Sequence, residues 1–264
     1  MPAPQARLAE TFARAAGMVQ SGSLAGAARE YEDARRTARS IEDADAIASA
    51  AINLSIVYQR LGRDDAAREA LAEVLDSPRR PMPARRVLQA QLRRAILLLA
   101  AGDAGAAETW ALRAESGCAS CDLSPAVANV RAQAALDRKD YPQGQALALR
   151  AADLARSLGN RAEGANALRL AGRAQLALGD PGAAAVALEQ ALELDHSLAD
   201  PRRILADLGE LGRAQAALGN AAAARAYFER ALAVGRALND SRAVAALEAQ
   251  IAGPAAISPV NERK

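Results

Sequence analysis

The chain is poor in the residues that would point to a metalloprotein, a redox enzyme or a membrane protein. It contains one histidine, two cysteines and one tryptophan among its 264 residues. It has no apolar run of about 18 residues, so we expect no transmembrane helix. Basic and acidic residues number 33 and 31, a net charge of +2 that gives no electrostatic preference for nucleic acid.

The two cysteines form a CxxC motif, Cys118 to Cys121, and the single histidine, His196, is distant in the sequence, where we expect a loop. A structural zinc ion needs about four ligands, so we expect no metal and no cofactor. A thioredoxin-like centre would require a βαβ context, which we do not find around this motif. Two interpretations stay open, a pair of free thiols or a short disulfide.

The compartment stays undecided. The first ten residues are polar and lack the apolar segment of a signal peptide, which favours a cytoplasmic protein by default. A disulfide between Cys118 and Cys121 would instead require an oxidising, extracytoplasmic compartment such as the periplasm. A processed mature chain would also lack a signal peptide.

Catalytic and phosphate-binding motifs are absent as well. The sequence contains no HExxH, no GxSxG, no Walker loop and no GxGxxG. We therefore expect that the protein is not an enzyme.

What the chain has in abundance is alanine, leucine, arginine and glutamate, which favour helix. A turn glycine recurs, mostly at steps of 40 residues, at Gly22, Gly62, Gly102, Gly179 and Gly219, and Lys139 fills the gap in this series. A fixed period of about 20 to 50 residues is typical of a solenoid. In Gly179-Asp180-Pro181, a helix stop is followed by a helix N-cap and a first-turn proline. Small residues at Gly172 and Ala184 predict a close approach of the two helices around this turn.

The last repeat carries the pattern Leu208, Leu211-Gly212, Gly219-Asn220, Ala224, Phe228 and Ala231, and the second carries Leu54, Tyr58, Gly62, Ala67 and Leu71. These residues resemble the tetratricopeptide repeat. The period departs from the usual ~34 residues of that family and is similar to extended repeats of bacterial regulatory and scaffold proteins. Arg94 and Arg131 also stand where the family has apolar residues.

The resemblance implies an all-α, right-handed α-solenoid of about six helix pairs with a C-terminal capping helix. We expect one solenoid over 1–252, with repeats at about 8–46, 47–86, 87–123, 124–163, 164–203 and 204–240, a Ser-capped helix at 241–252 and a loose tail at 253–264.

In this family the first helix of each pair lines the concave face, which implies a groove for a protein or peptide partner. The groove residues implied by this register are Asn53, Gln59, Asn129, Gln133, Asn166, Arg169, Arg173, Glu210 and Arg213. Arg169 and Arg173 share one helical face, and Arg213 follows Arg173 by one repeat. Arginines in this arrangement can hold a carboxylate or a phosphate, or can simply pair with Glu210.

We therefore predict a scaffold or adaptor module that binds a protein or peptide. Two alternatives remain, a self-associating structural scaffold that forms homo-oligomers, and a thiol-redox or metal-linked module at Cys118 and Cys121.

Overall fold

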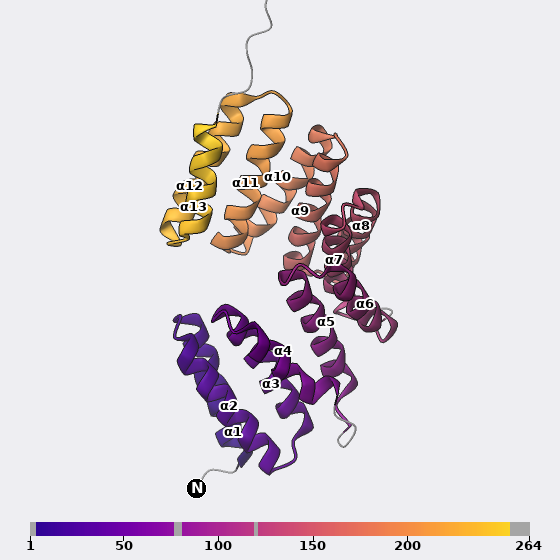
Figure 1. The fold of residues 1–264 in the computed structure, drawn as a ribbon, viewed down its shortest axis with the longest axis vertical. Coiled ribbons are helices and arrows are strands. Elements are labelled where there is room, and N and C mark those ends of the chain that lie inside the picture. The colour runs from indigo at the N-terminus through magenta and orange to yellow at the C-terminus, as the bar shows by residue number, and fades with distance from the viewer. Residues whose placement is uncertain (1–3, 77–80, 119–120, 254–264) are drawn as a thin grey trace, which may run out of the picture. The chain divides into compact units, whose positions relative to one another are not determined.

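The computed structural model describes residues 4–76, 81–118 and 121–253, and all regular secondary structure within these ranges is α-helical (Figure 1). This confirms the all-α prediction. None of the described helices is long and apolar enough to cross a membrane. The chain divides into two compact units, Met1–Leu123 and Ser124–Lys264.

The first unit consists of three helix pairs. They are α1 (Pro4–Gln20) with α2 (Leu24–Ser40), α3 (Ala44–Arg60) with α4 (Asp64–Leu75), and α5 (Ala84–Ala100) with α6 (Ala104–Ser116). The first helices α3 and α5 also contact each other directly. Leu54 and Leu71 are fully buried at the centre of this unit, with Tyr31 and Tyr58 packed around them.

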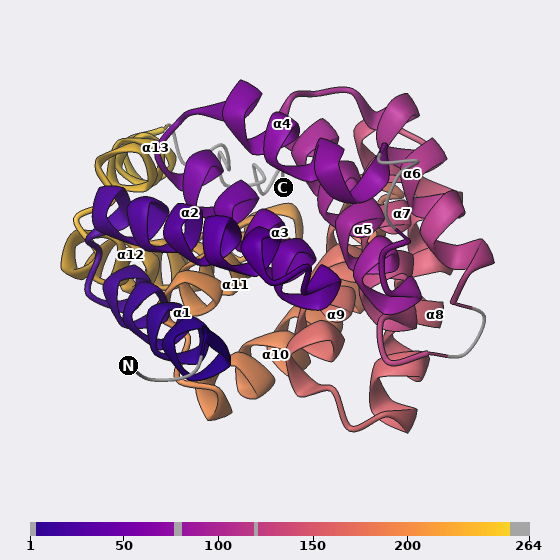
Figure 2. The same cartoon turned by 90° about the horizontal axis from the view of Figure 1, so that it is seen from below.

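The second unit consists of three further pairs and a final helix. They are α7 (Ser124–Asp137) with α8 (Tyr141–Ser157), α9 (Arg161–Ala177) with α10 (Pro181–Ser197), α11 (Pro201–Ala217) with α12 (Ala221–Ala237), and α13 (Ser241–Ala252). The first helix α9 contacts both α7 and α11, and α13 packs against α12 (Figure 2). Successive first helices therefore lie side by side, as in a solenoid.

One turn geometry recurs every twenty residues in the second unit. The backbone φ is positive at Lys139 (63°), Gly159 (64°), Gly179 (83°), Ala199 (51°), Gly219 (81°) and Asn239 (54°). Each of these residues is followed by Asp or Asn, and the Asp180 carboxylate, for example, accepts a hydrogen bond from the Ala183 amide at 3.0 Å. The 40-residue repeat thus consists of two similar helix-turn modules. The one short step, between Gly102 and Lys139, passes through α7, which has 14 residues where α9 and α11 have 17.

The predicted close approach within the pair α9–α10 is confirmed. A Cβ atom on Gly172 would lie 2.6 Å from Leu188 Cγ and 3.3 Å from the Ala184 carbonyl oxygen, so only glycine fits without a shift of the neighbours. Leu188 and Ala184 are both fully buried.

Two local predictions are wrong. His196 lies in the last turn of α10 rather than in a loop, because α10 continues to Ser197 and the left-handed turn after it is formed by Ala199, with no glycine to mark it in the sequence. The final helix is capped by Asp240 and not by Ser241, since the Asp240 carboxylate accepts from the Ala243 amide at 3.0 Å.

Candidate functional site

All nine predicted groove residues lie on the first helices of their pairs, on α3, α7, α9 and α11. We call the surface formed by the first helices of a unit its first-helix face. These helices are α1, α3 and α5 in the first unit, and α7, α9 and α11 in the second.

In the first unit, this face carries a hollow of about 440 Å³ between α1, α3 and α5. Leu8 and Phe12 of α1 supply its apolar lining, and Ser49 and Asn53 of α3 supply polar groups. The Asn53 amide makes no hydrogen bond to any described residue, so its donors and acceptor are available to a ligand.

An ion pair closes one side of this hollow. Arg86 of α5 donates to both carboxylate oxygens of Asp45, at 2.7 and 2.8 Å. These hydrogen bonds hold the pKa of Asp45 below its ordinary value. The pair therefore fixes α5 against α3 beside Asn53.

Arg93 of α5, which stands 40 residues after Asn53, was not predicted from the sequence. Its guanidinium is buried and donates to the Ser55 hydroxyl at 3.1 Å, to the Ser55 carbonyl at 3.0 Å and to Gln59 Oε1 at 2.7 Å. Burial lowers the pKa of Arg93 to about 10. Gln59 is thus engaged by α5, and the regular spacing was the only signal that could have drawn attention to Arg93.

In the second unit, three first helices are joined by a line of polar side chains. Arg173 of α9 donates to Gln133 Oε1 of α7 at 2.7 Å, and its Nε lies 3.7 Å from Glu210 Oε1 of α11. Arg213 binds both oxygens of Glu210, at 2.6 and 3.0 Å. The structure therefore brings together four of the predicted residues, and Arg213 is the most exposed of them, with 56% of its side chain accessible.

Arg169 has a different environment. Its guanidinium binds the carboxylates of Asp195 on α10 and Asp207 on α11, the latter at 2.5 Å from Nε. Both carboxylates are fully buried, and only 12% of the Arg169 side chain is exposed. Burial is the largest cause that raises the pKa of Asp207, to about 7; the neighbouring Asp195 adds to it and Arg169 opposes it. Neither aspartate was predicted from the sequence.

The two remaining predicted residues flank this group. Asn129 of α7 is 2% exposed and donates to the carbonyl and carboxylate of Glu163 on α9, at 3.0 and 2.7 Å. Asn166 Oδ1 lies 3.4 Å from Arg169 Nη1. The Asn129 contacts therefore join α7 to α9, whereas the Asn166 contact lies within α9 and borders the Arg169 guanidinium.

Two segments of the chain match a known protein family. Two family profiles described as tetratricopeptide repeat match residues 123–196 and 208–234. Residues 123–196 and 208–234 are therefore tetratricopeptide repeats. No curated protein sequence matches it significantly.

Solved tetratricopeptide-like structures share the fold at low sequence identity. BtubC (BKLC) from P. vanneervenii superposes with a TM-score of 0.66 and 20% identity, over 91% of this chain and 94% of that one. PilW, a type IV pilus biogenesis factor, gives a TM-score of 0.65 and 15% identity, over 91% and 98%. A Rap protein complexed with Competence and Sporulation Factor gives a TM-score of 0.65 and 13% identity, over 91% and 72%. These similarities establish the tetratricopeptide-repeat fold.

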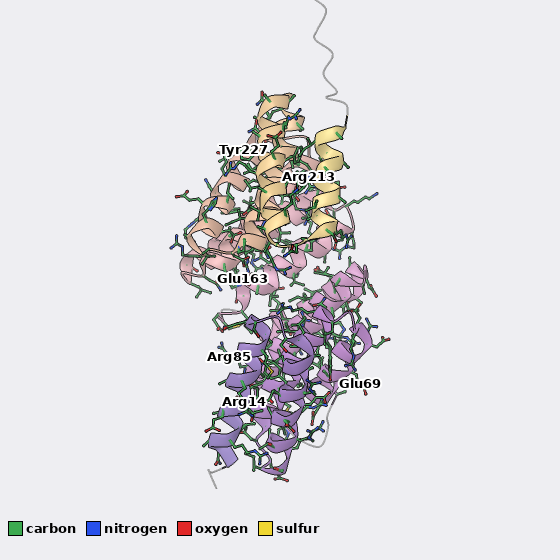
Figure 3. All side chains as sticks on the ribbon, turned by 90° about the vertical axis from the view of Figure 1, so that its left-hand side faces the viewer. Arg14, Glu69, Arg85, Glu163, Arg213 and Tyr227 are labelled. Atoms are coloured by element: carbon green, nitrogen blue, oxygen red, sulfur yellow. A yellow bond between two sulfur atoms is a disulfide. The ribbon has the colours of Figure 1, made fainter. Side chains whose placement is uncertain are left out.

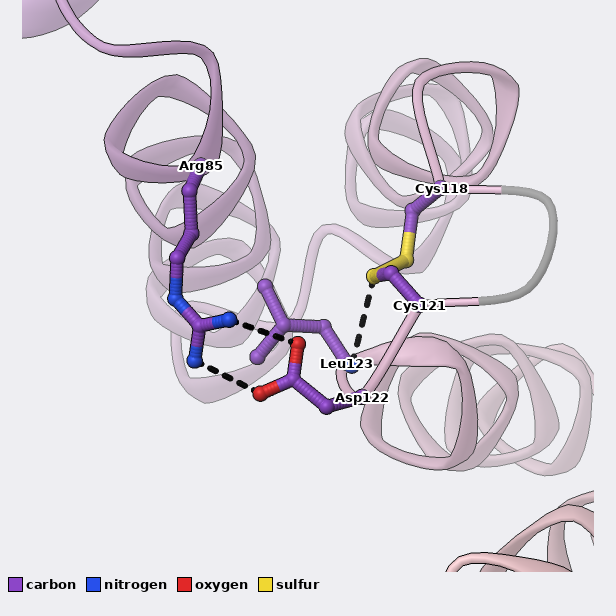
Figure 4. Close-up of a disulfide and its surroundings, with 5 residues drawn as sticks. All are labelled: Arg85, Cys118, Cys121, Asp122 and Leu123. Carbon is purple, nitrogen blue, oxygen red and sulfur yellow. Dashed lines mark hydrogen bonds and ion pairs between the residues drawn. A yellow bond between two sulfur atoms is a disulfide. The ribbon is translucent and has the colours of Figure 1, made fainter.

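Outside the first-helix face, Cys118 and Cys121 form a disulfide just after α6, with their Cα atoms 5.2 Å apart (Figure 4). The Leu123 amide donates to Cys121 Sγ at 3.3 Å, and Arg85 of α5 binds both oxygens of Asp122, at 2.9 and 2.6 Å. Within residues 4–76, 81–118 and 121–253, no group of three or more His, Cys, Asp or Glu side chains is arranged to hold a metal.

Proposed function

We propose that this tetratricopeptide-repeat protein is a non-catalytic scaffold or adaptor that binds a protein or peptide partner on the first-helix faces of its units. Asn53 in the first unit, and Arg173, Glu210 and Arg213 in the second, contact the partner. Gln59, Asn129, Gln133, Asn166 and Arg169 shape the face by holding neighbouring helices and side chains in place.

The observation that carries this proposal is the hollow around Asn53. It is lined by three successive first helices and combines an apolar wall from Leu8 and Phe12 with an unpaired amide. A side-chain amide can donate to a backbone carbonyl and accept from a backbone N–H of an extended peptide. The lining is mixed, with apolar side chains beside polar and charged groups that can fix the orientation of a bound segment.

The exposed arginines of the second unit support the same proposal. Arg173 and Arg213 present guanidinium groups on adjacent first helices, 36% and 56% exposed, and both neighbour the single carboxylate of Glu210. Two cations around one anion leave an excess positive charge that an acidic partner group would balance. Relatives of this fold offer a precedent, since the Rap protein is complexed with Competence and Sporulation Factor and Cut9 with Hcn1.

The test starts from peptides selected on the immobilised full chain from a phage-displayed random library. Their affinities are then measured by calorimetry for the wild type, for Asn53→Ala and for the double variant Arg173→Ala/Arg213→Ala. The matched control is Arg156→Ala/Arg225→Ala, which removes two exposed arginines from the second helices α8 and α12.

We expect the double arginine variant to weaken binding by about tenfold or more, since hydrogen bonds to charged groups contribute about 1.5–3 kcal/mol. Asn53→Ala should weaken binding by about twofold to tenfold, since a neutral hydrogen bond contributes about 0.5–1.5 kcal/mol. The control should bind like the wild type. If both double variants lose affinity equally, or neither does, the arginines are not part of the binding face. Failure to select any peptide, together with concentration-dependent sedimentation, would favour a self-associating scaffold.

A further inference from the structure

The last inter-helix space of the second unit differs from the one before it. Between α9 and α11, the Arg169 side chain lies against Asp195 and Asp207. Forty residues further along the chain, these three positions are Gly209, Gly235 and Leu247. The ion-paired group of one repeat is therefore replaced by two glycines and an apolar side chain in the next.

Two of these residues, Gly209 and Leu247, line a hollow of about 320 Å³ between α11 and α13. Leu205, Phe228 and Leu247 line it with apolar surface, and a Cβ atom on Gly209 would have no neighbour within 4 Å. The volume lies at the lower end of the range for ligand pockets, roughly 300–1,000 Å³, which suits one large side chain rather than a cofactor.

Two arginines of α11, Arg202 and Arg213, border the hollow. Eleven residues separate them, so they lie on nearly the same side of the helix and roughly 16 Å apart along its axis. Arg213 binds Glu210, whereas the Arg202 guanidinium has no ion pair or hydrogen bond within the described part of the chain. Arg213 lies beside α13 in Figure 3. Arg202 therefore places an uncompensated positive charge at the border of the hollow, and Arg213 shares the one carboxylate of Glu210 with Arg173.

We infer that this hollow receives one large apolar side chain of an acidic partner segment, with carboxylates on both sides of that side chain binding Arg202 and Arg213. An extended peptide advances about 3.3 Å per residue, so roughly five residues span the two arginines. This inference rests on the proposed function, because it places the partner at the C-terminal end of the second unit's first-helix face.

The test uses fluorescein-labelled synthetic peptides and fluorescence anisotropy. The probe carries one phenylalanine with two glutamates on each side. One control peptide has serine in place of phenylalanine, and another has lysines in place of the glutamates. The blocking variant is Gly209→Leu. Gly209 lies on α11 and has free space around its Cβ position, so the leucine side chain can fill the hollow without disturbing the helix. Its matched control is Gly17→Leu, at an exposed glycine of α1 whose Cβ would also have no neighbour within 4 Å.

We expect the wild type and Gly17→Leu to bind the probe alike. Gly209→Leu should bind it at least about tenfold more weakly, since burying a large apolar side chain contributes about 1.5–3 kcal/mol. Arg202→Glu should bind it at least about tenfold more weakly as well, because it replaces the charge-assisted hydrogen bonds to a carboxylate with repulsion between like charges. Both control peptides should also bind at least tenfold more weakly. Circular dichroism and thermal unfolding of each variant check that the fold is kept.

Equal binding by Gly209→Leu, equal binding of the lysine peptide, or no binding of the probe to the wild type would overturn the inference. A homodimer that Gly209→Leu abolishes would assign the hollow to a second copy of the chain and would overturn it as well. If library-selected peptides bind through Asn53 while Gly209→Leu has no effect on any peptide, the inference fails and the proposed function stands. If no peptide from either source binds, both fail.

Discussion

Arg169 and Asp207 form a buried ion pair in which the Arg169 Nε donates to an Asp207 carboxylate oxygen at 2.5 Å. Asp195 binds the same guanidinium, and the nearest second cation is Arg203, 3.9 Å from Asp195. Asp207 Oδ2 and Asp195 Oδ1 have no hydrogen-bond donor. Two carboxylates therefore share one well-placed arginine, and a proton on Asp207 would relieve their repulsion.

This arrangement predicts a pH-dependent free energy of unfolding. The pKa of Asp207 is about 7 in the folded chain against 3.8 ordinarily, so folding favours its protonated form. Its stabilising contribution is fully present below pH 3.8 and is lost as the pH rises through about 7. Each unit of pKa difference corresponds to about 1.4 kcal/mol.

We expect Asp207→Asn to remove this loss of stability between about pH 4 and pH 7, as measured by urea unfolding at several pH values. Asp153→Asn, at an exposed aspartate of α8, is the control and should keep the wild-type dependence. Identical pH profiles for Asp207→Asn and the wild type would contradict the prediction.

A second prediction concerns the turn at Ala199. Its φ of 51° lies in the left-handed region, which costs an ordinary L-residue about 1–2 kcal/mol. Glycine adopts this conformation freely but loses more entropy on folding. We therefore expect Ala199→Gly to stabilise the fold by about 0.5–1 kcal/mol and to raise the Tm in thermal unfolding.

The opposite change at the equivalent position supplies the control. Gly179 has a φ of 83°, so Gly179→Ala should lower the Tm by a similar amount. If Ala199→Gly lowers the Tm, the left-handed conformation at this turn is not a source of strain.

A third prediction concerns the contact of Gly172 with α10. Gly172→Ala would place a methyl group 2.6 Å from Leu188 Cγ and 3.3 Å from a backbone oxygen of Ala184. Overpacking of this kind costs about 1–3 kcal/mol, so we expect a lower midpoint in urea unfolding. Gly17→Ala, in open space on α1, should be neutral or stabilising because alanine favours helix. Equal midpoints for Gly172→Ala and the wild type would show that α9 and α10 can separate at no cost.

Much of the fold could be predicted because turn chemistry is local. A helix stop, an N-cap and a first-turn proline in Gly179-Asp180-Pro181 identify a turn without knowledge of the rest of the chain. The turns at Glu42, Ala199 and Asn239 have the same left-handed backbone without glycine. Because these turns lack glycine, the recurring glycines in the sequence indicate a period of 40 residues, although the turn geometry of the second unit recurs every twenty.

The site was less predictable because its contacts join distant residues. Periodicity placed Arg169 and Arg173 on one helical face. It could not show that Asp195, near the end of α10, and Asp207, on α11, both point at Arg169 and not at Arg173. Which carboxylate an arginine binds depends on the packing of three helices, and helical spacing carries no information about that.

The regular turns allow the gene for this chain to gain or lose repeats without disturbing the junctions between helices. Gly179 and Gly219 occupy equivalent backbone positions, with φ values of 83° and 81°, and each precedes an Asp or Asn followed by a second helix. In-frame recombination between these two turns would delete α10 and α11. It would then join α9 to α12 through a turn of the same geometry. Duplication of the same segment would insert a whole helix pair. Repeats of this kind can therefore be gained or lost as modules, and with the pair removed here the chain would also lose Arg202 and the hollow between α11 and α13.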